Sequence, residues 1–330
     1  MQIIWWIMLG VGIGVASLVG LVGGRKWIKG RQFREKIDAT GKVVLITGAN
    51  SGIGKQLSME MNKRGAKVYM LCRSVQRGQE AANELSEKFK CDANRLLVRQ
   101  LDLCSFSSVR SFVEKFDEKK VDVLICNAGV MWLPRFELTE DGNETTLQAN
   151  HLGHFLLTEL LMPKLEAAPA ARVVVTSSKL HEHANSCSIE RMNNKEEYGA
   201  YQSYARAKLA SVLHAVELTR RLRQRNPNTK VTINSLHPGV VNTNLIRSPI
   251  YTKFLKYAFY PFIWYFNKTE SDGCQCTLYV SLSSKIEGVS GKYFDNSAVT
   301  KPHKLARDEQ LCRHFYDESI RAVQLDKTQM

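Results

Sequence analysis

A tyrosine and a lysine in the second half of the chain have the spacing needed for proton transfer. Tyr204 and Lys208 lie four residues apart in a stretch that predicts a helix over residues 201–225, so their side chains project from one face. A free phenol has a pKa of about 10, and a neighbouring ammonium favours the phenolate. We therefore expect Lys208 to lower the pKa of Tyr204 and make it a general acid–base group. Such a pair also arises by chance, so this interpretation depends on what surrounds it.

A glycine-rich segment near the start of the chain has the pattern of a phosphate-binding loop. It lies between an apolar strand predicted at residues 42–47 and a helix predicted to end near residue 65, and it reads Thr47-Gly48-Ala49-Asn50-Ser51-Gly52-Ile53-Gly54. Glycines permit a tight turn and let the backbone approach a pyrophosphate, while the helix N-terminus offers N–H groups and a favourable dipole. Structural turns use glycine too, but the position directly after a buried strand favours dinucleotide binding.

The end of the second predicted strand indicates which dinucleotide is bound. An acid there would accept hydrogen bonds from the adenosine ribose and favour NAD, but the segment reads Leu71-Cys72-Arg73-Ser74. Arg73 could pair with a 2′-phosphate, which favours NADP(H) as the cofactor. The alternative is a surface arginine that opens the next helix.

The elements that must position these residues alternate along the chain. Short apolar strands are predicted at residues 42–47, 67–72, 96–101, 121–126, 172–177 and 231–236. Besides the helix after the glycine segment, helices are predicted at residues 75–90, 106–118, 147–165 and 201–225. Continuous apolar strands separated by helices predict an α/β fold, a Rossmann-like doubly wound parallel sheet covered on both faces, in a single domain.

Further motifs complete a set that resembles the short-chain dehydrogenase/reductase family over about residues 40–300. Beside the segments above, these motifs are Asn127-Ala128-Gly129 after a strand, Asn150, Ser178 at a strand end and Pro238-Gly239. Cys126 stands where the family often has another asparagine. Within the family the chain is most similar to retinol dehydrogenases and related membrane-bound members, on segments 147–157, 236–245 and 288–294. That subgroup typically reduces retinal or other lipophilic carbonyls with NADPH.

The resemblance implies a role for each matching residue. Tyr204 would be the acid–base group on the substrate oxygen, and Lys208 would lower its pKa and hold the nicotinamide ribose. Ser178 would orient the carbonyl, and Asn150 would support a water in a proton relay. The other matches would bind the cofactor: Gly48, Asn50, Ser51, Gly52, Ile53 and Gly54 in the phosphate loop, Asp102 and Leu103 at the adenine, Asn127, Ala128 and Gly129 at the sheet edge, and Pro238, Gly239 and Thr243 beside the nicotinamide.

The N-terminal end predicts a membrane anchor. Residues 1–24 carry no charged side chain, and residues 3–22 form an apolar run about long enough to cross a bilayer. Six basic residues against one acid follow at 25–36, which places the C-terminal side in the cytosol by the positive-inside tendency. We expect an anchor at 1–24, a basic juxtamembrane linker at 25–40 and a catalytic domain at 41–330, single-pass in the endoplasmic reticulum membrane. A mitochondrial membrane, a lipid droplet, an interfacial hairpin and a cleaved peptide stay open.

An aromatic stretch at residues 251–266 predicts an apolar lid over about residues 244–268. Such a lid would admit a lipophilic substrate, such as a retinoid, a steroid or a lipid aldehyde or ketone. The alternative is a patch that docks on the membrane or on a second subunit, so a homodimer stays open. His181 and His183 are interpreted as loop histidines rather than substrate contacts.

The expected reaction is hydride transfer between NADPH and a lipophilic aldehyde or ketone, retinal first, with Tyr204 giving the proton. One rival is a hydroxysteroid or other lipid-carbonyl reductase, and a rival of another class is a non-catalytic membrane adaptor that retains the nucleotide-binding fold. The net charge is +14, but no nucleic-acid-binding motif accompanies it, so no nucleic-acid partner is expected. Eight cysteines match no disulfide or zinc framework, and no metal is expected.

Overall fold

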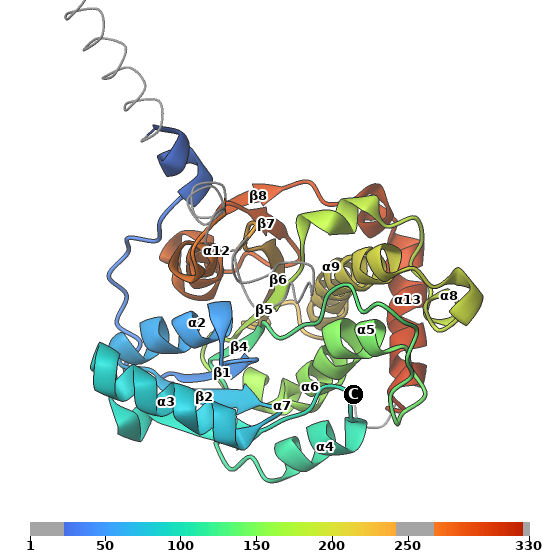
Figure 1. Ribbon diagram of the computed structural model, residues 1–330. Coiled ribbons are helices and arrows are strands. Elements are labelled where there is room, and N and C mark those ends of the chain that lie inside the picture. The colour runs from blue at the N-terminus through green and yellow to red at the C-terminus, as the bar shows by residue number, and fades with distance from the viewer. Residues whose placement is uncertain (1–22, 242–266, 326–330) are drawn as a thin grey trace, which may run out of the picture.

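The computed structural model describes residues 23–241 and 267–325, and its centre is an eight-stranded sheet (Figure 1). The strand order is β3-β2-β1-β4-β5-β6-β7-β8. The strands are β1 (Val43–Thr47), β2 (Lys67–Cys72), β3 (Leu96–Gln100), β4 (Val123–Cys126), β5 (Arg172–Thr176), β6 (Thr232–His237), β7 (Tyr293–Asp295) and β8 (Ala298–Thr300). β1 to β7 pair in parallel, and β8 pairs with β7 antiparallel. The predicted parallel sheet is confirmed, with one antiparallel strand at its edge.

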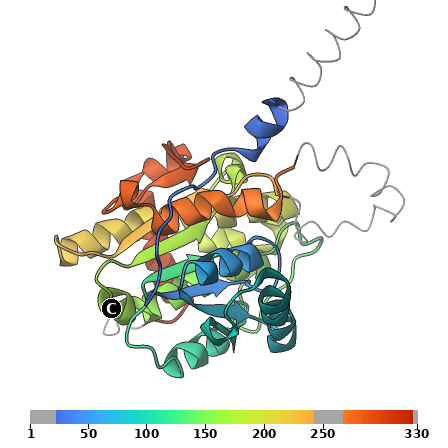
Figure 2. The same cartoon turned by 90° about the vertical axis from the view of Figure 1, so that its left-hand side faces the viewer.

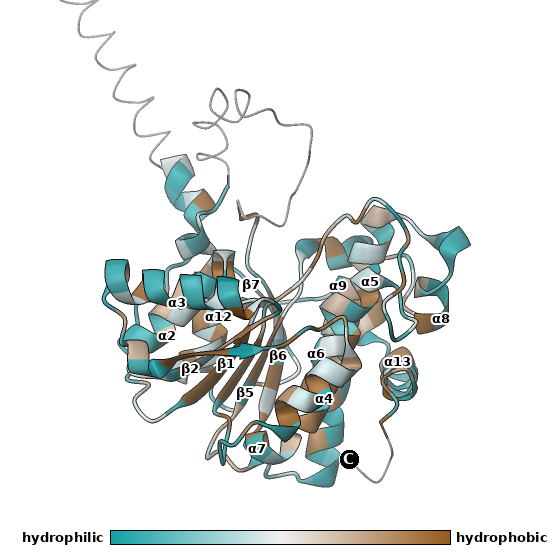
Figure 3. Ribbon diagram, turned by 60° about the horizontal axis from the view of Figure 1, so that its bottom comes forward, coloured by the Kyte–Doolittle hydropathy of each residue, from teal (hydrophilic) through white to brown (hydrophobic). Residues whose placement is uncertain are grey.

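Burial on both faces explains why the strands are continuous hydrophobic runs. All five residues of β1 are buried. Val43 and Leu45 belong to the apolar core on one face of the sheet, and Val44 and Ile46 to the core on the other. Successive side chains of a strand point to opposite faces, so a strand covered on both sides must be apolar at every position. Figure 3 shows the strands enclosed between two layers of helices.

Two groups of helices form these layers. On one face lie α2 (Gly52–Lys63), α3 (Val75–Phe89) and α12 (Glu270–Leu282). On the other face lie α4 (Phe106–Glu114), α6 (Gly153–Leu160) and α9 (Ala200–Arg225), with α13 (Glu309–Ala322) packed against α9. The doubly wound arrangement therefore has both faces closed by helices, as the strand pattern predicted.

The helix predicted at residues 147–165 is divided in the structure. It consists of α5 (Thr145–Leu147), the π-helix η2 (Gln148–Leu152), α6 and α7 (Met162–Glu166). α7 has a proline in its first turn, where the missing N–H cannot continue the preceding helix. π-helical turns are rare and often mark functional sites, and this one carries Asn150. Helix α4 and strands β3 and β4 are also shorter than predicted, by one to four residues at their ends.

Several elements of the C-terminal third were not predicted. α12 buries residues all around its circumference, so it shows no amphipathic period, and β7 and β8 have three residues each. Short elements elsewhere in the chain and in this third were not predicted either: η1 (Ala93–Arg95), η3 (Lys179–His183), α8 (Ile189–Met192), η4 (Lys195–Glu197), η5 (Ser284–Ile286) and η6 (Lys304–Arg307). Segments this short carry too little periodicity to be distinguished from loops by sequence.

The chain enters the domain along its surface. Residues 23–29 are helical, and residues 30–39 then run without regular structure past α12 to β1 (Figure 2). Within residues 23–241 and 267–325, no helix has the length and apolar character needed to span a bilayer. The predicted anchor falls almost wholly in residues 1–22, outside the described residues. Thr243 and nearly all of the predicted lid fall in residues 242–266, which are also outside them.

Candidate active site

The carboxyl ends of the parallel strands bring the predicted residues to one edge of the sheet. The chain moves outward from β1 to β3 and then returns to β4 on the other side of β1. In a doubly wound sheet, this reversal opens a crevice beyond the strand ends, where ligands bind. Gly48 follows β1, Asn127 follows β4 and Ser178 lies two residues beyond β5, so all three reach that edge.

The glycine segment after β1 forms a tight cradle. Gly48 and Gly52 have φ angles of +67° and +57°, left-handed values that favour glycine. A Cβ atom on Gly54 would lie 2.4 Å from the carbonyl oxygen of Gly48, so no side chain fits there. Ser51 begins α2 without a side-chain cap, and the first turn has no acid. The N–H groups of this turn and the helix dipole therefore fit the phosphates of a dinucleotide. The other predicted residues of this turn are half-buried: Asn50 and Ile53.

Thr47, the last residue of β1, joins this cradle to the end of β4. Its hydroxyl oxygen accepts from the N–H groups of Asn127 and Ala128, each at 2.9 Å. Asn127 Nδ2 donates to the Thr47 carbonyl at 3.0 Å. Thr47 Oγ1 also lies 2.8 Å from Nε2 of the buried His154. Because the oxygen already takes two N–H donors, the hydroxyl hydrogen has this ring nitrogen as its nearest acceptor.

His154 has a function in the site that the sequence analysis missed. Burial lowers the pKa of His154 to about 3, so the ring is neutral and can accept from Thr47. Its Nδ1 lies 3.4 Å from the backbone carbonyl oxygen of Asn150, one turn earlier. The spacing of four from Asn150 is the sequence signal that could have indicated it, since residues so spaced share a helix face.

The residues predicted at the adenosine end follow β2 and β3. Arg73 is exposed directly after β2. Burial raises the pKa of the Cys104 thiol, in the loop after β3, and the positive charge of Arg73 opposes part of that rise. Arg73 is therefore close to this loop. Asp102 is half-buried, and its Oδ1 accepts from the Cys104 N–H at 2.9 Å. Leu103 is buried beside Gly153, which has no room for a Cβ atom. Arg73 and Asp102 therefore lie near each other, beyond the carboxyl ends of β2 and β3.

Helix α9 brings the proton-transfer residues to the end of β5. Tyr204 and Lys208 are 5% and 4% exposed, and the Ser178 side chain lies close enough to the Tyr204 phenol to lower its pKa by hydrogen bonding. Lys208 Nζ donates to the Thr176 carbonyl at 3.0 Å and lies 5.6 Å from the centre of the Tyr204 ring. Ser177 Oγ donates to the Lys208 carbonyl at 2.7 Å, which holds α9 against the strand end. The predicted trio is thus brought together.

The predicted lowering of the Tyr204 pKa by Lys208 is wrong. Burial raises the pKa of Tyr204 to about 12, and the hydrogen bond with Ser178 opposes only part of this rise. Burial also lowers the pKa of Lys208 to about 8, and its ammonium is directed at a backbone carbonyl. The prediction weighed the neighbouring charge but could not weigh the burial. A buried phenol with a raised pKa stays protonated at neutral pH, which is the form that gives a proton to a carbonyl oxygen.

Asn150 fixes the loop after β4 and lies close to Lys208. Its Oδ1 accepts from the Val130 N–H at 3.1 Å, and its Nδ2 donates to the carbonyls of Val130 and Thr146 at 2.9 and 3.0 Å. A Cβ atom on Gly129 would lie 2.4 Å from Asn150 Oδ1 and 3.5 Å from Lys208 Nζ. The loop at Gly129 thus lies against both side chains.

Pro238 and Gly239 follow β6 at the same edge. Gly239 has φ of +93°, and a Cβ atom there would lie 2.5 Å from Cδ of Lys268. The Lys268 N–H donates to the Val240 carbonyl at 2.8 Å, and Val241 pairs with Lys268 in a parallel bridge. Val241 and Lys268, which flank residues 242–266 in the sequence, are therefore held side by side, next to Gly239.

His181, predicted to be a loop histidine, lies in a short turn and is buried. It lies in η3 with none of its side chain exposed, and its ring packs 4.6 Å from that of Tyr293. Its Nδ1 donates to the Ser178 carbonyl at 2.7 Å, and its Nε2 accepts from the His303 N–H at 3.2 Å. Because Nε2 accepts, the ring is neutral with its hydrogen on Nδ1, and burial lowers its pKa. His181 therefore positions the backbone of Ser178. His183, in the same turn, is exposed.

The cysteines form no second site. All eight are unpaired, and all but Cys104 are buried, where they act as small apolar side chains. Across the part of the chain that the structure describes, no three His, Cys, Asp or Glu side chains are grouped to hold a metal.

The chain belongs to the short chain dehydrogenase family, as its motifs predicted. The family model of that description matches residues 42–250, which contain every residue predicted for the site. The family's fold binds a nicotinamide dinucleotide, and the chain is an oxidoreductase that acts on CH–OH groups. The glycine cradle, which a Cβ atom would obstruct, fits such a dinucleotide in this chain.

Named relatives cover nearly the whole chain. Retinol dehydrogenase 14 of Mus musculus is 39% identical over 326 residues, 92% of this chain and 96% of that protein. Retinol dehydrogenase 12 of Homo sapiens is 40% identical over 297 residues, 89% of this chain and 90% of that protein. A crystal structure of an uncharacterized protein from Mycobacterium Paratuberculosis is similar in fold, with a TM-score of 0.71 and 29% identity over 89% of this chain and 98% of that one. The resemblance to retinol dehydrogenases is therefore confirmed.

Proposed function

We propose that the chain is an NADP(H)-dependent reductase of lipophilic aldehydes and ketones, with retinal as the first substrate to test. The observation that carries the proposal is the buried Tyr204, protonated at neutral pH, beside Ser178 and Lys208 at the end of β5. The relatives named retinol dehydrogenase support a retinoid as the substrate class. The intact proton-transfer group speaks against an adaptor without activity.

The residues of the chain divide the chemistry among them. The nicotinamide supplies the hydride when it is bound. The Ser178 hydroxyl holds the substrate oxygen, and Tyr204 gives its proton to that oxygen as the hydride arrives. Lys208, with its pKa near 8, is largely protonated at neutral pH, and it binds the nicotinamide ribose. Asn150, which shares the loop at Gly129 with Lys208, supports the route by which a proton returns to Tyr204.

Arg73 is the basis for choosing NADP(H). It stands exposed after β2, where an NAD-specific site would have an acid, and its charge extends to the loop after β3. A guanidinium there can make charge-assisted hydrogen bonds to a 2′-phosphate. The remaining cofactor contacts in this proposal are the glycine cradle, Asp102, Asn127 and the turn at Pro238.

We also propose, from the sequence, the surroundings of the site in the cell. We place the chain at the endoplasmic reticulum membrane through residues 1–24, with the catalytic domain in the cytosol. The aromatic segment between Val241 and Lys268 in the sequence would form the entrance for a substrate dissolved in lipid. A second copy of the chain is compatible with this arrangement.

The test follows NADPH oxidation by the full chain in neutral detergent with all-trans-retinal. NADH replaces NADPH in a parallel series, and Tyr204→Phe replaces the wild-type chain in another. Turnover that prefers NADPH and is lost in the variant is the expected result. Turnover with a steroid or lipid ketone but not with retinal would change the substrate class. Absence of NADPH binding would overturn the proposal.

A further inference from the structure

The basic segment after the predicted anchor is attached to the domain rather than free. We call residues 25–37 the strap. Within it, Arg25 pairs with Asp272 of α12 at 3.5 Å, and the Phe33 N–H donates to Gln275 Oε1 of the same helix at 2.9 Å. The Phe33 ring meets Tyr279 edge-on at 6.4 Å. These contacts hold the strap along α12, as Figure 2 shows for the path of the chain.

Further contacts continue along the strap on both sides of Phe33. The Arg31 N–H donates to Asn296 Oδ1 between β7 and β8 at 2.7 Å. Glu35 accepts from Ser283 Oγ at 2.7 Å beyond the end of α12. Apart from Arg25, the basic side chains make none of these contacts, which come from the backbone, the Phe33 ring and Glu35.

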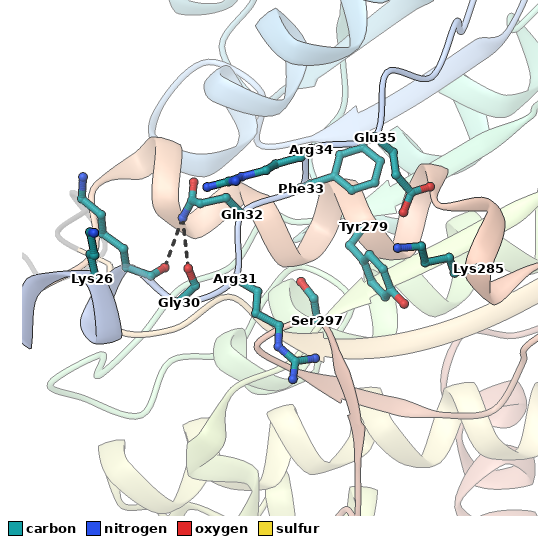
Figure 4. A pocket seen from close by; sticks show the side chains of 11 residues that line it. Lys26, Gly30, Arg31, Gln32, Phe33, Arg34, Glu35, Tyr279, Lys285 and Ser297 are labelled. Carbon is teal, nitrogen blue, oxygen red and sulfur yellow. Dashed lines mark hydrogen bonds between the residues drawn. The ribbon is translucent and has the colours of Figure 1, made fainter. Parts of the chain in front are cut away.

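A cavity of about 1010 Å³ lies between the strap, α12 and the turn before β8 (Figure 4). None of the residues predicted for the active site lines it. Its wall includes the Phe33 and Tyr279 rings, which Figure 4 shows together. Its charged residues are one carboxylate, Glu35, and five cations: Lys26, Lys29, Arg31, Arg34 and Lys285.

Four cations of the strap that line the cavity have no carboxylate partner among the described residues, whereas Arg25 pairs with Asp272. Glu35 is bound by serine hydroxyls and acts electrostatically on Lys285. Among the ion pairs of the described residues, no carboxylate pairs with Lys26, Lys29, Arg31 or Arg34, and all four are exposed. Like charges gathered on one segment repel one another, so an anion in the cavity would be stabilised.

The place of the cavity indicates where the anion comes from. Trp27 lies between Lys26 and Lys29 in the chain and is 83% exposed. An exposed tryptophan among lysines just after an apolar run is typical of the level of lipid headgroups. A Cβ atom on Gly30 would lie 3.1 Å from Lys268 Nζ, so the strap lies beside Lys268. The cavity and Lys268 are therefore on the same side of the domain.

We propose that this cavity binds the phosphate-bearing headgroup of an anionic phospholipid and so turns the face of the domain that carries Lys268 toward the bilayer. The basic side chains pair with the phosphate, and the Phe33 and Tyr279 rings pack against the glycerol and the upper acyl chain. This inference rests on the bilayer attachment proposed above, but not on the oxidoreductase chemistry.

The test measures lipid binding by the full chain held in neutral detergent micelles. Short-chain dihexanoyl phosphatidylserine is titrated by calorimetry against matched phosphatidylcholine, with inorganic phosphate as a third arm. The variant replaces Lys26, Lys29, Arg31 and Arg34 together by Gln, which leaves the backbone contacts of the strap. The control replaces four exposed lysines elsewhere by Gln, with the same loss of charge: Lys115, Lys119, Lys195 and Lys230.

We expect phosphatidylserine to bind at least roughly tenfold more tightly than phosphatidylcholine. The strap variant should bind phosphatidylserine at least roughly tenfold more weakly than the wild type, since each cation near an anionic lipid surface adds appreciably to binding. The control should bind as the wild type does. Equal binding of both lipids, or an equal loss in the control, would overturn the proposal. Equally tight binding of inorganic phosphate would make this a site for soluble anions and would overturn it too. Retinal turnover in detergent is scored separately, so either proposal can fail alone.

Discussion

The two halves of the strand-end edge are built in different ways. Beyond β1 and β2, the site consists of backbone: glycines that exclude any side chain, a helix N-terminus without a side-chain cap, and one exposed arginine. Beyond β4 and β5, it consists of buried polar side chains with displaced pKa values, Tyr204 and Lys208 above all. The first half suits recognition of a large anion by shape and charge, and the second suits transfer of one proton. Substitutions in the first should therefore change binding, and in the second turnover.

The sharpest test of this division is Tyr204→Phe. The ring and its packing stay, but the proton donor is lost, so kcat should fall by about 100- to 10,000-fold, the usual contribution of a general acid. The dissociation constant for NADPH should stay close to that of the wild type, because the cradle beyond β1 is unchanged. Steady-state kinetics and fluorescence titration measure the two quantities. A comparable loss in both would erase the distinction between the halves.

Gly54→Ala tests the opposite half. The added Cβ atom would lie 2.4 Å from the Gly48 carbonyl and 2.7 Å from Asn127 Nδ2. Overpacking of this kind costs about 1–3 kcal/mol, so NADPH binding should weaken by roughly 10- to 100-fold while kcat at saturating cofactor is largely kept. Gly288→Ala is the control, because Gly288 has φ of +71° but open space around it. Unchanged NADPH affinity in Gly54→Ala would show that the cradle tolerates a side chain.

The same division decides how much could be predicted from the sequence. The cradle is one contiguous segment directly after one strand. Its glycines and the apolar strand before them are therefore sufficient to predict it. The parallel pairing of the strands also follows from the alternating elements, since parallel strands need crossover connections. The proton-transfer residues lie far apart in the sequence, Ser178 after β5 and Tyr204 and Lys208 on α9. They were predicted from the resemblance to a family. Their burial depends on packing from α13, η3 and the loop after β4, which no local pattern contains. That is why the direction of the Tyr204 pKa shift was wrong.

The sites that the sequence analysis missed teach the same lesson. His154 and His181 each support a predicted residue through one hydrogen bond, to Thr47 and to the Ser178 carbonyl. The spacing of four places His154 near Asn150, but no pattern in the sequence indicates that it meets Thr47 or that His181 meets the Ser178 carbonyl. α12 was not predicted because it is buried on all sides, and yet it holds the strap.

Arg73→Ser tests the half beyond β1 and β2 further. It removes the positive charge of Arg73 and leaves the shape of the glycine cradle unchanged. An exposed guanidinium bound to phosphate contributes about 1.5 kcal/mol, the lower end for charged hydrogen bonds, because solvent and salt screen it. NADPH should therefore bind roughly tenfold more weakly. NADH, which lacks the 2′-phosphate, is the internal control and should bind as before. Parallel fluorescence titrations with the two cofactors measure the change. If NADPH and NADH lost affinity equally, Arg73 would stabilise the start of the next helix and would not bind the 2′-phosphate.

The last prediction concerns stability rather than binding or turnover, at the buried histidine that joins the two halves. The pKa of His154 is lowered to about 3 in the folded chain, by burial first and then by the charges of Lys208 and His214 against a hydrogen bond to Asn150. In the unfolded chain it returns to about 6.5. The unfolded state therefore binds the extra proton, and stability is complete above about pH 6.5 and is lost as the pH falls toward 3. The loss approaches about 1.4 kcal/mol per pH unit for this residue.

The measurement compares urea unfolding of His154→Gln with that of the wild type from about pH 7 to about pH 5. The variant is expected to be less stable near neutral pH, because its bond to Thr47 is altered, but to lose less stability on acidification. His183→Gln, at an exposed position, is the control and should follow the wild type. Parallel pH profiles for His154→Gln and the wild type would mean that the ring takes a proton in the folded state. The Thr47 hydroxyl would then have to release one of its two N–H donors, and the link between the cradle and the proton-transfer half would be looser than the structure indicates.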